Sequence, residues 1–313
     1  MSNQPIGSAS PSTHSPSKAT TFLRRLTSTV ILWTVVIGAL FSGNHLISDC
    51  FFLTILCVLA WSGLMEFYGL AEKTGLISFR IWGVFCGLLL IIGTYLHFHG
   101  QLGIYGTPAR VNDFETSVLI LFVLGLCVRQ FLRHELAKGI TAIATTLFGL
   151  MYVPWLLNFI QKINFFQGVE GTWYVLYFIL VTKFSDVGAY AVGSLIGKHK
   201  MIPRVSPGKT WEGFGGALVV STLASLLFAH FAGSHLAGMN PLHAVVLGLI
   251  LSSAAVVGDL IESIFKREAG VKDSGGFFPG IGGILDLLDS LLFNAPLMYL
   301  YLRHILTHSV GNP

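Results

Sequence analysis

Three stretches of this sequence place carboxylates at helical spacing inside otherwise apolar runs. Residues three, four and seven positions apart lie on one face of a helix, so each stretch predicts a polar stripe on an apolar rod. The stripes are Asp286, Asp289 and Ser290 in GILDLLDS; Asp259, Glu262, Ser263 and Lys266 in GDLIESIFKR; and Lys183, Asp186 and Tyr190 in KFSDVGAY.

The stripes are predicted to lie at similar depth, so they can converge on one cavity. Asp259 precedes Lys266 by seven residues, which is about 10 Å at a rise of about 1.5 Å per residue. Any single pair, such as Lys183 with Asp186, is also explained by an internal salt bridge. Clustered carboxylates without enough cations instead favour a hard metal ion, and oxygen ligands without Cys or His suit Mg²⁺.

The elements that carry the stripes are predicted to be membrane-spanning helices. The chain is 53% hydrophobic and 11% charged, with a mean hydropathy of +0.71, whereas soluble domains are about a quarter charged. Apolar runs near the length needed for a span, about 20 residues, predict an all-α, polytopic helical bundle of about nine transmembrane helices. The runs are 26–43, 47–70, 81–98, 116–132, 138–159, 173–195, 213–233, 242–264 and 282–303.

The distribution of Lys and Arg predicts a cytoplasmic N-terminus. With that orientation, 15 of the 19 basic residues fall in cytoplasmic segments and 3 on the opposite side, with Lys183 inside a span. The net charge of +4 is then a topology signal and needs no nucleic-acid partner. Residues 1–20, rich in Ser, Thr and Pro, are predicted to form a disordered cytosolic tail.

The chemistry is concentrated in the second half of the chain. We expect 21–170 to be N-terminal transmembrane helices, with Glu66 as the main ionisable exception, and 171–313 to be the catalytic region. Its two predicted cytoplasmic loops combine Lys and Arg with glycine, a combination that binds phosphate. SPGKT is not a P-loop, because Pro203 occupies the place of the first glycine. The GxxxG of Gly193 and Gly197 is interpreted as helix packing within the chain.

These residues resemble the phosphatidate cytidylyltransferases, also called CDP-diglyceride synthases. The family's C-terminal signature reads approximately S-x-x-K-R-x4-K-D-x-G-x3-P-G-H-G-G-x-x-D-R-x-D, and SIFKREAGVKDSGGFFPGIGGILDLLDS follows it in register. DVGAYAVGSLIGKHK and SPGKTWEG also look like family segments, so the resemblance covers about residues 180–300. Two positions depart from it: Ile281 replaces the family's His, and Leu287 replaces its Arg.

The resemblance implies that CTP and phosphatidic acid react to give CDP-diacylglycerol and pyrophosphate at the cytoplasmic face of the membrane. Catalysis is then expected to be positioning and charge neutralisation by cations, with Mg²⁺ as cofactor and a second cation left open. The implied metal ligands are Asp259, Asp286 and Asp289. The implied phosphate-holding residues are Lys209, Lys266, Arg267 and Lys272, with Ser206 and Thr210 as hydroxyl donors and Asp186 and Glu262 as further acids.

Other functions stay open at this stage. A CTP-dependent kinase of a polyprenol-type lipid would move the γ-phosphate of CTP, and a degenerate enzyme or transporter would retain the intramembrane charges without turnover. We expect the bilayer as a partner, no nucleic acid, and leave a homodimer open. The compact chain without targeting signals favours the bacterial inner membrane over an organelle.

Overall fold

The computed structural model describes residues 30, 33–38, 40–41, 45–99, 108–133, 138–275 and 282–307. The predicted tail 1–20, half of the first predicted span (26–43) and the departure at Ile281 lie outside these residues. The predictions made for them are therefore not tested by the structure.

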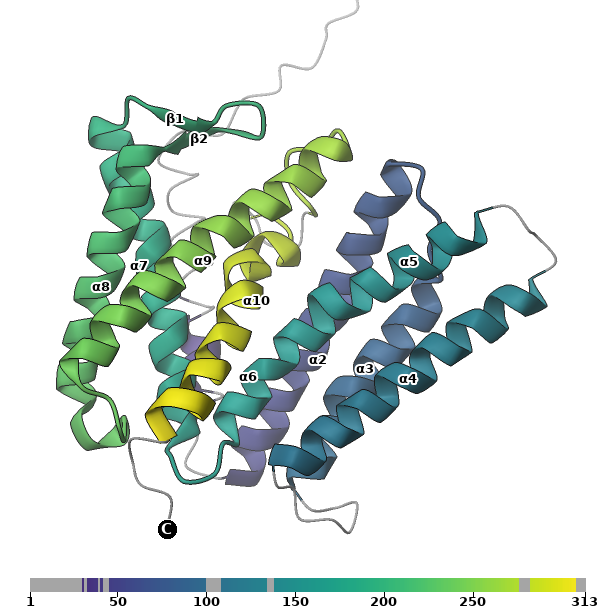
Figure 1. Ribbon diagram of the computed structural model, residues 1–313, viewed down its shortest axis with the longest axis horizontal. Helices are drawn as coiled ribbons and strands as arrows, with labels where there is room; N and C mark the ends of the chain where they lie inside the picture. Colours follow the sequence, from purple (N-terminus) through teal and green to yellow (C-terminus); the bar gives the residue numbers. More distant parts are fainter. Residues whose placement is uncertain are drawn as a thin grey trace, which may run out of the picture.

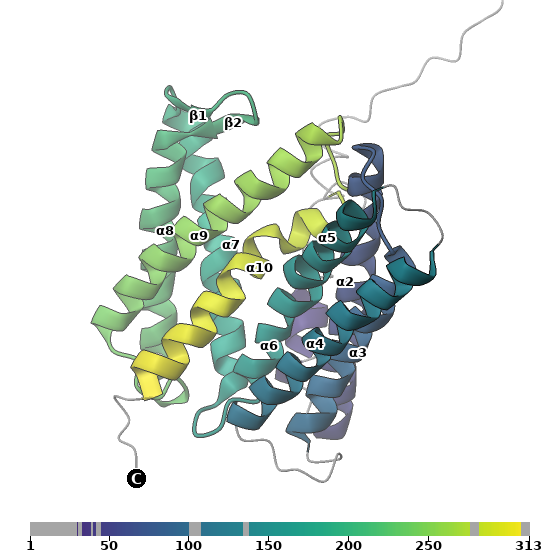
Figure 2. The same cartoon turned by 45° about the vertical axis from the view of Figure 1, so that its right-hand side comes forward.

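The described chain is a bundle of long helices, as Figures 1 and 2 show from two directions. Within the described residues, eight helical segments are long and apolar enough to cross a membrane, and they correspond to eight of the nine predicted spans. Their elements are α2 (His45–Lys73), α3 (Arg80–Phe98), α4 (Pro108–Leu132), α5 (Gly139–Leu150) continued by α6 (Leu156–Asn164), α7 (Gly171–Ile196), α8 (Trp211–Ala232), α9 (Pro241–Glu268) and α10 (Ile284–Tyr301). The prediction of a polytopic all-α membrane protein is confirmed.

The remaining elements are short. A hairpin of β1 (Lys200–Ile202) and β2 (Ser206–Thr210) joins α7 to α8, with Lys200 opposite Thr210. The sequence predicts only a loop for this segment, and the hairpin was not predicted. The 3₁₀ turn η2 (Gly233–His235) follows α8, and the π-helical turn η3 (Leu302–Leu306) extends α10. We call the end of the bundle that carries the hairpin the hairpin end (Figure 1).

A π-helical turn, η1 (Met151–Trp155), joins α5 to α6 without ending the helix. It contains the buried Pro154, which has no backbone N–H and whose ring would clash with the preceding turn of a regular α-helix. A π-bulge widens that turn and accommodates the proline. The predicted span 138–159 is therefore one segment, Gly139–Asn164, with an irregular turn inside it.

The outer surface of the bundle is apolar, and inside the bundle glycines allow neighbouring helices to pack closely. Phe231 and Leu195 are 82% and 83% exposed, as expected of side chains that face lipid. On the inside, a Cβ added to Gly188 of α7 would lie 2.6 Å from the carbonyl oxygen of Gly216 of α8, so these helices touch backbone to backbone. Gly193 of α7 likewise packs on Gly213 of α8, as expected for GxxxG packing within the chain.

The N-terminal helices bury an ion pair that the predicted spans leave out. Glu115 precedes the predicted span 116–132 and Lys162 follows the predicted span 138–159, but the helices extend further and bury the Lys162 and Glu115 side chains at 4% and 6% exposure. The Lys162 ammonium lies 2.5 Å from the Glu115 carboxylate, and Asn158 donates a hydrogen bond of 2.6 Å to the same acid. This pair links α4 to α6.

Replacing Lys162 by Met is expected to lower the free energy of unfolding by about 3–5 kcal/mol, because it leaves the Glu115 charge buried and unpaired. Thermal unfolding of the detergent-solubilised protein measures the effect. The matched control is Lys162→Met combined with Glu115→Gln, which removes both charges and is expected to recover much of the loss. An unchanged midpoint in the single variant would contradict the importance of this pair.

Candidate active site

The candidate site begins where α9 and α10 pass each other. A Cβ added to Gly258 of α9 would lie 2.5 Å from the carbonyl oxygen of Asp289 and 3.0 Å from the Phe293 ring of α10. Only a residue without a side chain permits this approach of two backbones. Because Asp259 follows Gly258 directly, the crossing brings the acidic stripes of the two helices together.

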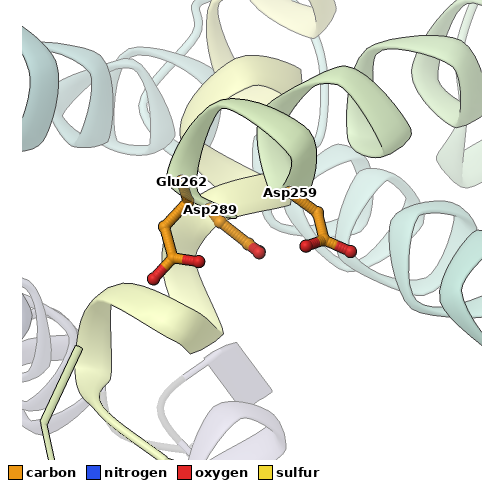
Figure 3. A group of neighbouring side chains, drawn as sticks. All are labelled: Asp259, Glu262 and Asp289. Carbon is orange, nitrogen blue, oxygen red and sulfur yellow. The ribbon is translucent and has the colours of Figure 1, made fainter. Parts of the chain in front are cut away.

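Three carboxylates meet at this crossing. Asp259 and Glu262 come from α9 and Asp289 from α10, and each offers an oxygen within 4.8 Å of the others. Figure 3 shows the three side chains on the same side of the α9 ribbon. Glu262 is fully buried and Asp289 is 7% exposed. This geometry confirms the predicted convergence for two of the three stripes, those of α9 and α10.

The carboxylates have fewer cationic partners than their charges require. Lys209 lies 2.8 Å from Asp259, and Lys266 forms an ion pair with Glu262. Asp289 accepts a hydrogen bond of 2.5 Å from the Ser290 amide but has no ion-pair partner among the described residues. Buried like charges repel each other, so an all-oxygen set of this kind is chemically suited to a hard divalent cation.

Asp286 is not one of these three carboxylates, although Lys266 joins it to Glu262. One of its carboxylate oxygens accepts hydrogen bonds from the Gly283 amide at 2.7 Å and from the Ser274 amide and hydroxyl at 3.1 and 2.9 Å. The other accepts one from Lys266 at 2.6 Å. The structure thus gives Asp286 the contacts of an N-terminal cap for α10. Its role as a metal ligand stays a prediction.

Glu66 of α2 supports the same helix end, and the sequence analysis did not place it in the site. Its carboxylate accepts hydrogen bonds from the amides of Ile284 and Leu285 at 3.0 and 2.8 Å, and it lies 3.0 Å from the Ser274 hydroxyl, whose single proton it shares with Asp286. These amides have no acceptor within α10. The signal in the sequence was Glu66 itself, an ionisable residue inside an apolar span.

A cavity of about 450 Å³ opens beside the carboxylates, between α7, β2, α8 and α9. Five of the predicted site residues line it: Asp186, Ser206, Lys209, Thr210 and Asp259. Asp186 forms an ion pair of 3.4 Å with Lys183. The Thr210 hydroxyl accepts a hydrogen bond of 3.1 Å from the Gly213 amide, so it caps α8 and is only partly available to a ligand.

The two remaining predicted phosphate-holding residues lie outside the cavity. The Arg267 guanidinium donates to the carbonyl of Val205 at 3.0 Å and to that of Val271 at 3.4 Å, and so ties α9 to the hairpin. Lys272 is exposed on the loop that follows α9. Their binding roles stay predictions.

Of the two departures from the family signature, Leu287 lies within the described residues. Its side chain is 8% exposed, and its carbonyl accepts a hydrogen bond of 3.4 Å from Lys183 of α7. Lys183 therefore brings a positive charge from another helix close to the position where the family carries Arg.

Replacing Gly258 by Val is expected to abolish activity, because the new side chain would push α10 away from α9 and separate Asp289 from Asp259. Turnover and thermal unfolding of the purified variant measure the effect. The matched control is Gly215→Val on α8, where an added Cβ meets nothing within 4 Å. Near-normal activity of Gly258→Val would contradict the assignment of the helix crossing to the site.

Comparisons with known proteins identify the family of this chain. Residues 23–305 match the model of a family described as the cytidylyltransferase family. The chain is 40% identical over 259 residues to a phosphatidate cytidylyltransferase of Mycobacterium leprae, covering 72% of this chain and 81% of the relative. It is 46% identical over 201 residues to one of Staphylococcus saprophyticus, covering 62% and 72%. It is also 39% identical over 244 residues to the uncharacterized protein YnbB of Escherichia coli, covering 73% and 77%.

The chain therefore belongs to the cytidylyltransferase family, a class of nucleotide-transferring enzymes. The resemblance found in its motifs is confirmed, and so is its nature as a multi-pass membrane enzyme.

Proposed function

We propose that this protein is a phosphatidate cytidylyltransferase, which makes CDP-diacylglycerol and pyrophosphate from CTP and phosphatidate. The observation that carries the proposal is the meeting of Asp259, Glu262 and Asp289 beside a cavity lined by Lys209 at one end of a membrane bundle. The relatives from Mycobacterium leprae and Staphylococcus saprophyticus, which bear this name, support it. We further propose that the hairpin end faces the cytoplasm of a bacterial inner membrane, where a lipid phosphate can meet a soluble nucleotide.

In the proposed reaction, a phosphate oxygen of phosphatidate attacks the α-phosphorus of CTP. A new phosphorus–oxygen bond forms, the bond from the α-phosphorus to the β-phosphate breaks, and pyrophosphate leaves with the electron pair. The attacking oxygen is already anionic, so the reaction needs no Ser or Cys nucleophile. The difficulty is to bring several negative charges together.

The chain divides that task between acids and cations. Asp259, Glu262 and Asp289 would hold a divalent cation such as Mg²⁺, which offsets phosphate charge when bound. Lys209 projects into the cavity beside them and can contact a phosphate by exchanging its ion pair with Asp259 for one with the nucleotide. Ser206, at the cavity wall, offers a hydroxyl to the same ligand. A second cation and a homodimer stay open within this proposal.

The test is an assay of the purified full chain with labelled CTP, Mg²⁺ and phosphatidic acid. We expect a CDP-lipid and pyrophosphate in equal amounts, and no product when Mg²⁺ is chelated. Release of CDP with phosphorylation of a lipid alcohol would instead identify a lipid kinase. No turnover with either lipid would overturn the proposal.

A further inference from the structure

A second cavity lies far from the carboxylates, at the hairpin end of α3 and α4. These helices stand at the side of the bundle opposite α8 (Figure 1). The cavity measures about 470 Å³ and is lined by Arg80 at the start of α3 and by Arg129 and Arg133 at the end of α4. Nothing in the proposed reaction uses these three arginines.

Two of the three arginines are oriented by an aromatic ring. The guanidinium carbons of Arg129 and Arg133 lie 5.1 and 5.7 Å from the centroid of the Phe79 ring. Phe79 is itself buried, and its amide donates a hydrogen bond of 2.8 Å to the Thr146 hydroxyl of α5. Stacking on a ring orients a guanidinium but leaves its N–H donors free for an anion. Arg129 has no hydrogen-bond or ion-pair partner among the residues that the structure describes.

Two further features of the cavity suit an anion. The first turn of α3 has no side-chain cap, and its first two residues, Arg80 and Ile81, line the cavity. The hydroxyl oxygen of Ser78, also in the lining, is buried and has no hydrogen-bond partner among the described residues. A carboxylate does approach from one side, since Glu72 lies 3.9 Å from Arg80, but that pair is half-exposed and long.

The rim of the cavity shows what kind of anion fits. Ile81 and Leu132 also line the cavity and are 80% and 70% exposed on the lipid-facing surface of their helices. A free phosphate would gain nothing from these side chains, whereas a phospholipid would place its headgroup among the arginines and its acyl chains along them. We propose that this cavity binds the headgroup of an anionic phospholipid, separately from the catalytic carboxylates.

The test titrates the detergent-solubilised full chain with phosphatidylglycerol, phosphatidylcholine or inorganic phosphate and counts bound ligand by native mass spectrometry. We expect phosphatidylglycerol to bind about tenfold or more tightly than phosphatidylcholine, and Arg129→Gln with Arg133→Gln to remove that preference. A photoactivatable phosphatidylglycerol is expected to label peptides of α3 and α4. The matched control, Lys73→Gln with Lys138→Gln, loses two exposed charges at the same end and should bind as the wild type does.

Ser78→Ala provides an independent check, because it changes no charge and is expected to weaken phosphatidylglycerol binding several-fold while leaving the unfolding midpoint unchanged. Three outcomes would overturn the proposal: equal binding of both lipids, equal loss in the Lys73 and Lys138 control, or inorganic phosphate binding as tightly as phosphatidylglycerol. The last result would identify a free phosphate as the ligand.

Discussion

Replacing Asp289 by Asn is expected to lower kcat by about 10²–10³-fold, because it removes one oxygen ligand from the group that it forms with Asp259 and Glu262. The same substitution is not expected to lower the stability of the protein. Asp289 is buried without an ion-pair partner among the described residues, so its neutralisation is expected to leave the unfolding midpoint unchanged or raise it. Steady-state kinetics and thermal unfolding measure the two effects.

The effect of Mg²⁺ on the unfolding midpoint distinguishes the loss of a metal ligand from a general disturbance of the site. Mg²⁺ should raise the unfolding midpoint of the wild type, because a ligand that binds only the folded state stabilises it, and should raise that of Asp289→Asn much less. Glu268→Gln, an exposed acid on α9, is the matched control and should respond as the wild type does. A full Mg²⁺ response in Asp289→Asn would remove Asp289 from the proposed ligands.

The comparison with Asp286→Asn tests the other predicted ligand. Asn at this position would place an amide donor among the donors from Gly283, Ser274 and Lys266, so we expect loss of both turnover and stability. Loss of turnover and of the Mg²⁺ response with an unchanged midpoint would instead identify Asp286 as a metal ligand.

Replacing Lys266 by Met is expected to abolish activity and to lower the free energy of unfolding by about 3–5 kcal/mol. The Lys266 ammonium lies between Glu262, which is fully buried, and Asp286, at 2.6 Å from the latter. Its loss leaves both acids without this cation and releases the contact between α9 and the start of α10. Thermal unfolding and turnover of the purified variant measure these effects.

A second substitution distinguishes repulsion from loss of packing. Adding Glu262→Gln to Lys266→Met removes one of the unpaired charges and should restore part of the stability but no activity. Lys73→Met, an exposed lysine at the end of α2, is the control and should change neither. If Lys266→Met kept the wild-type midpoint, its link between α9 and α10 would have no structural importance.

The spans and the stripes were predictable because the interactions that produce them are local. In lipid each backbone polar group must be satisfied within its own helix, so apolar runs determine where helices form. Spacings of three and four residues then place Asp259 with Glu262 and Asp286 with Asp289 on shared faces. The motifs that resemble the cytidylyltransferases are likewise contiguous, which is why they indicated the family before the fold was known.

Which acids meet was decided by contacts between distant segments. The absence of a side chain at Gly258 lets α9 approach α10 and joins Asp289 to Asp259, while Ser274 and Gly283 draw Asp286 to the helix end. Glu66 reaches that helix end from a segment more than 200 residues earlier in the chain. Local spacing specifies the face on which a carboxylate lies, but its neighbour depends on where another helix crosses, and that depends on packing.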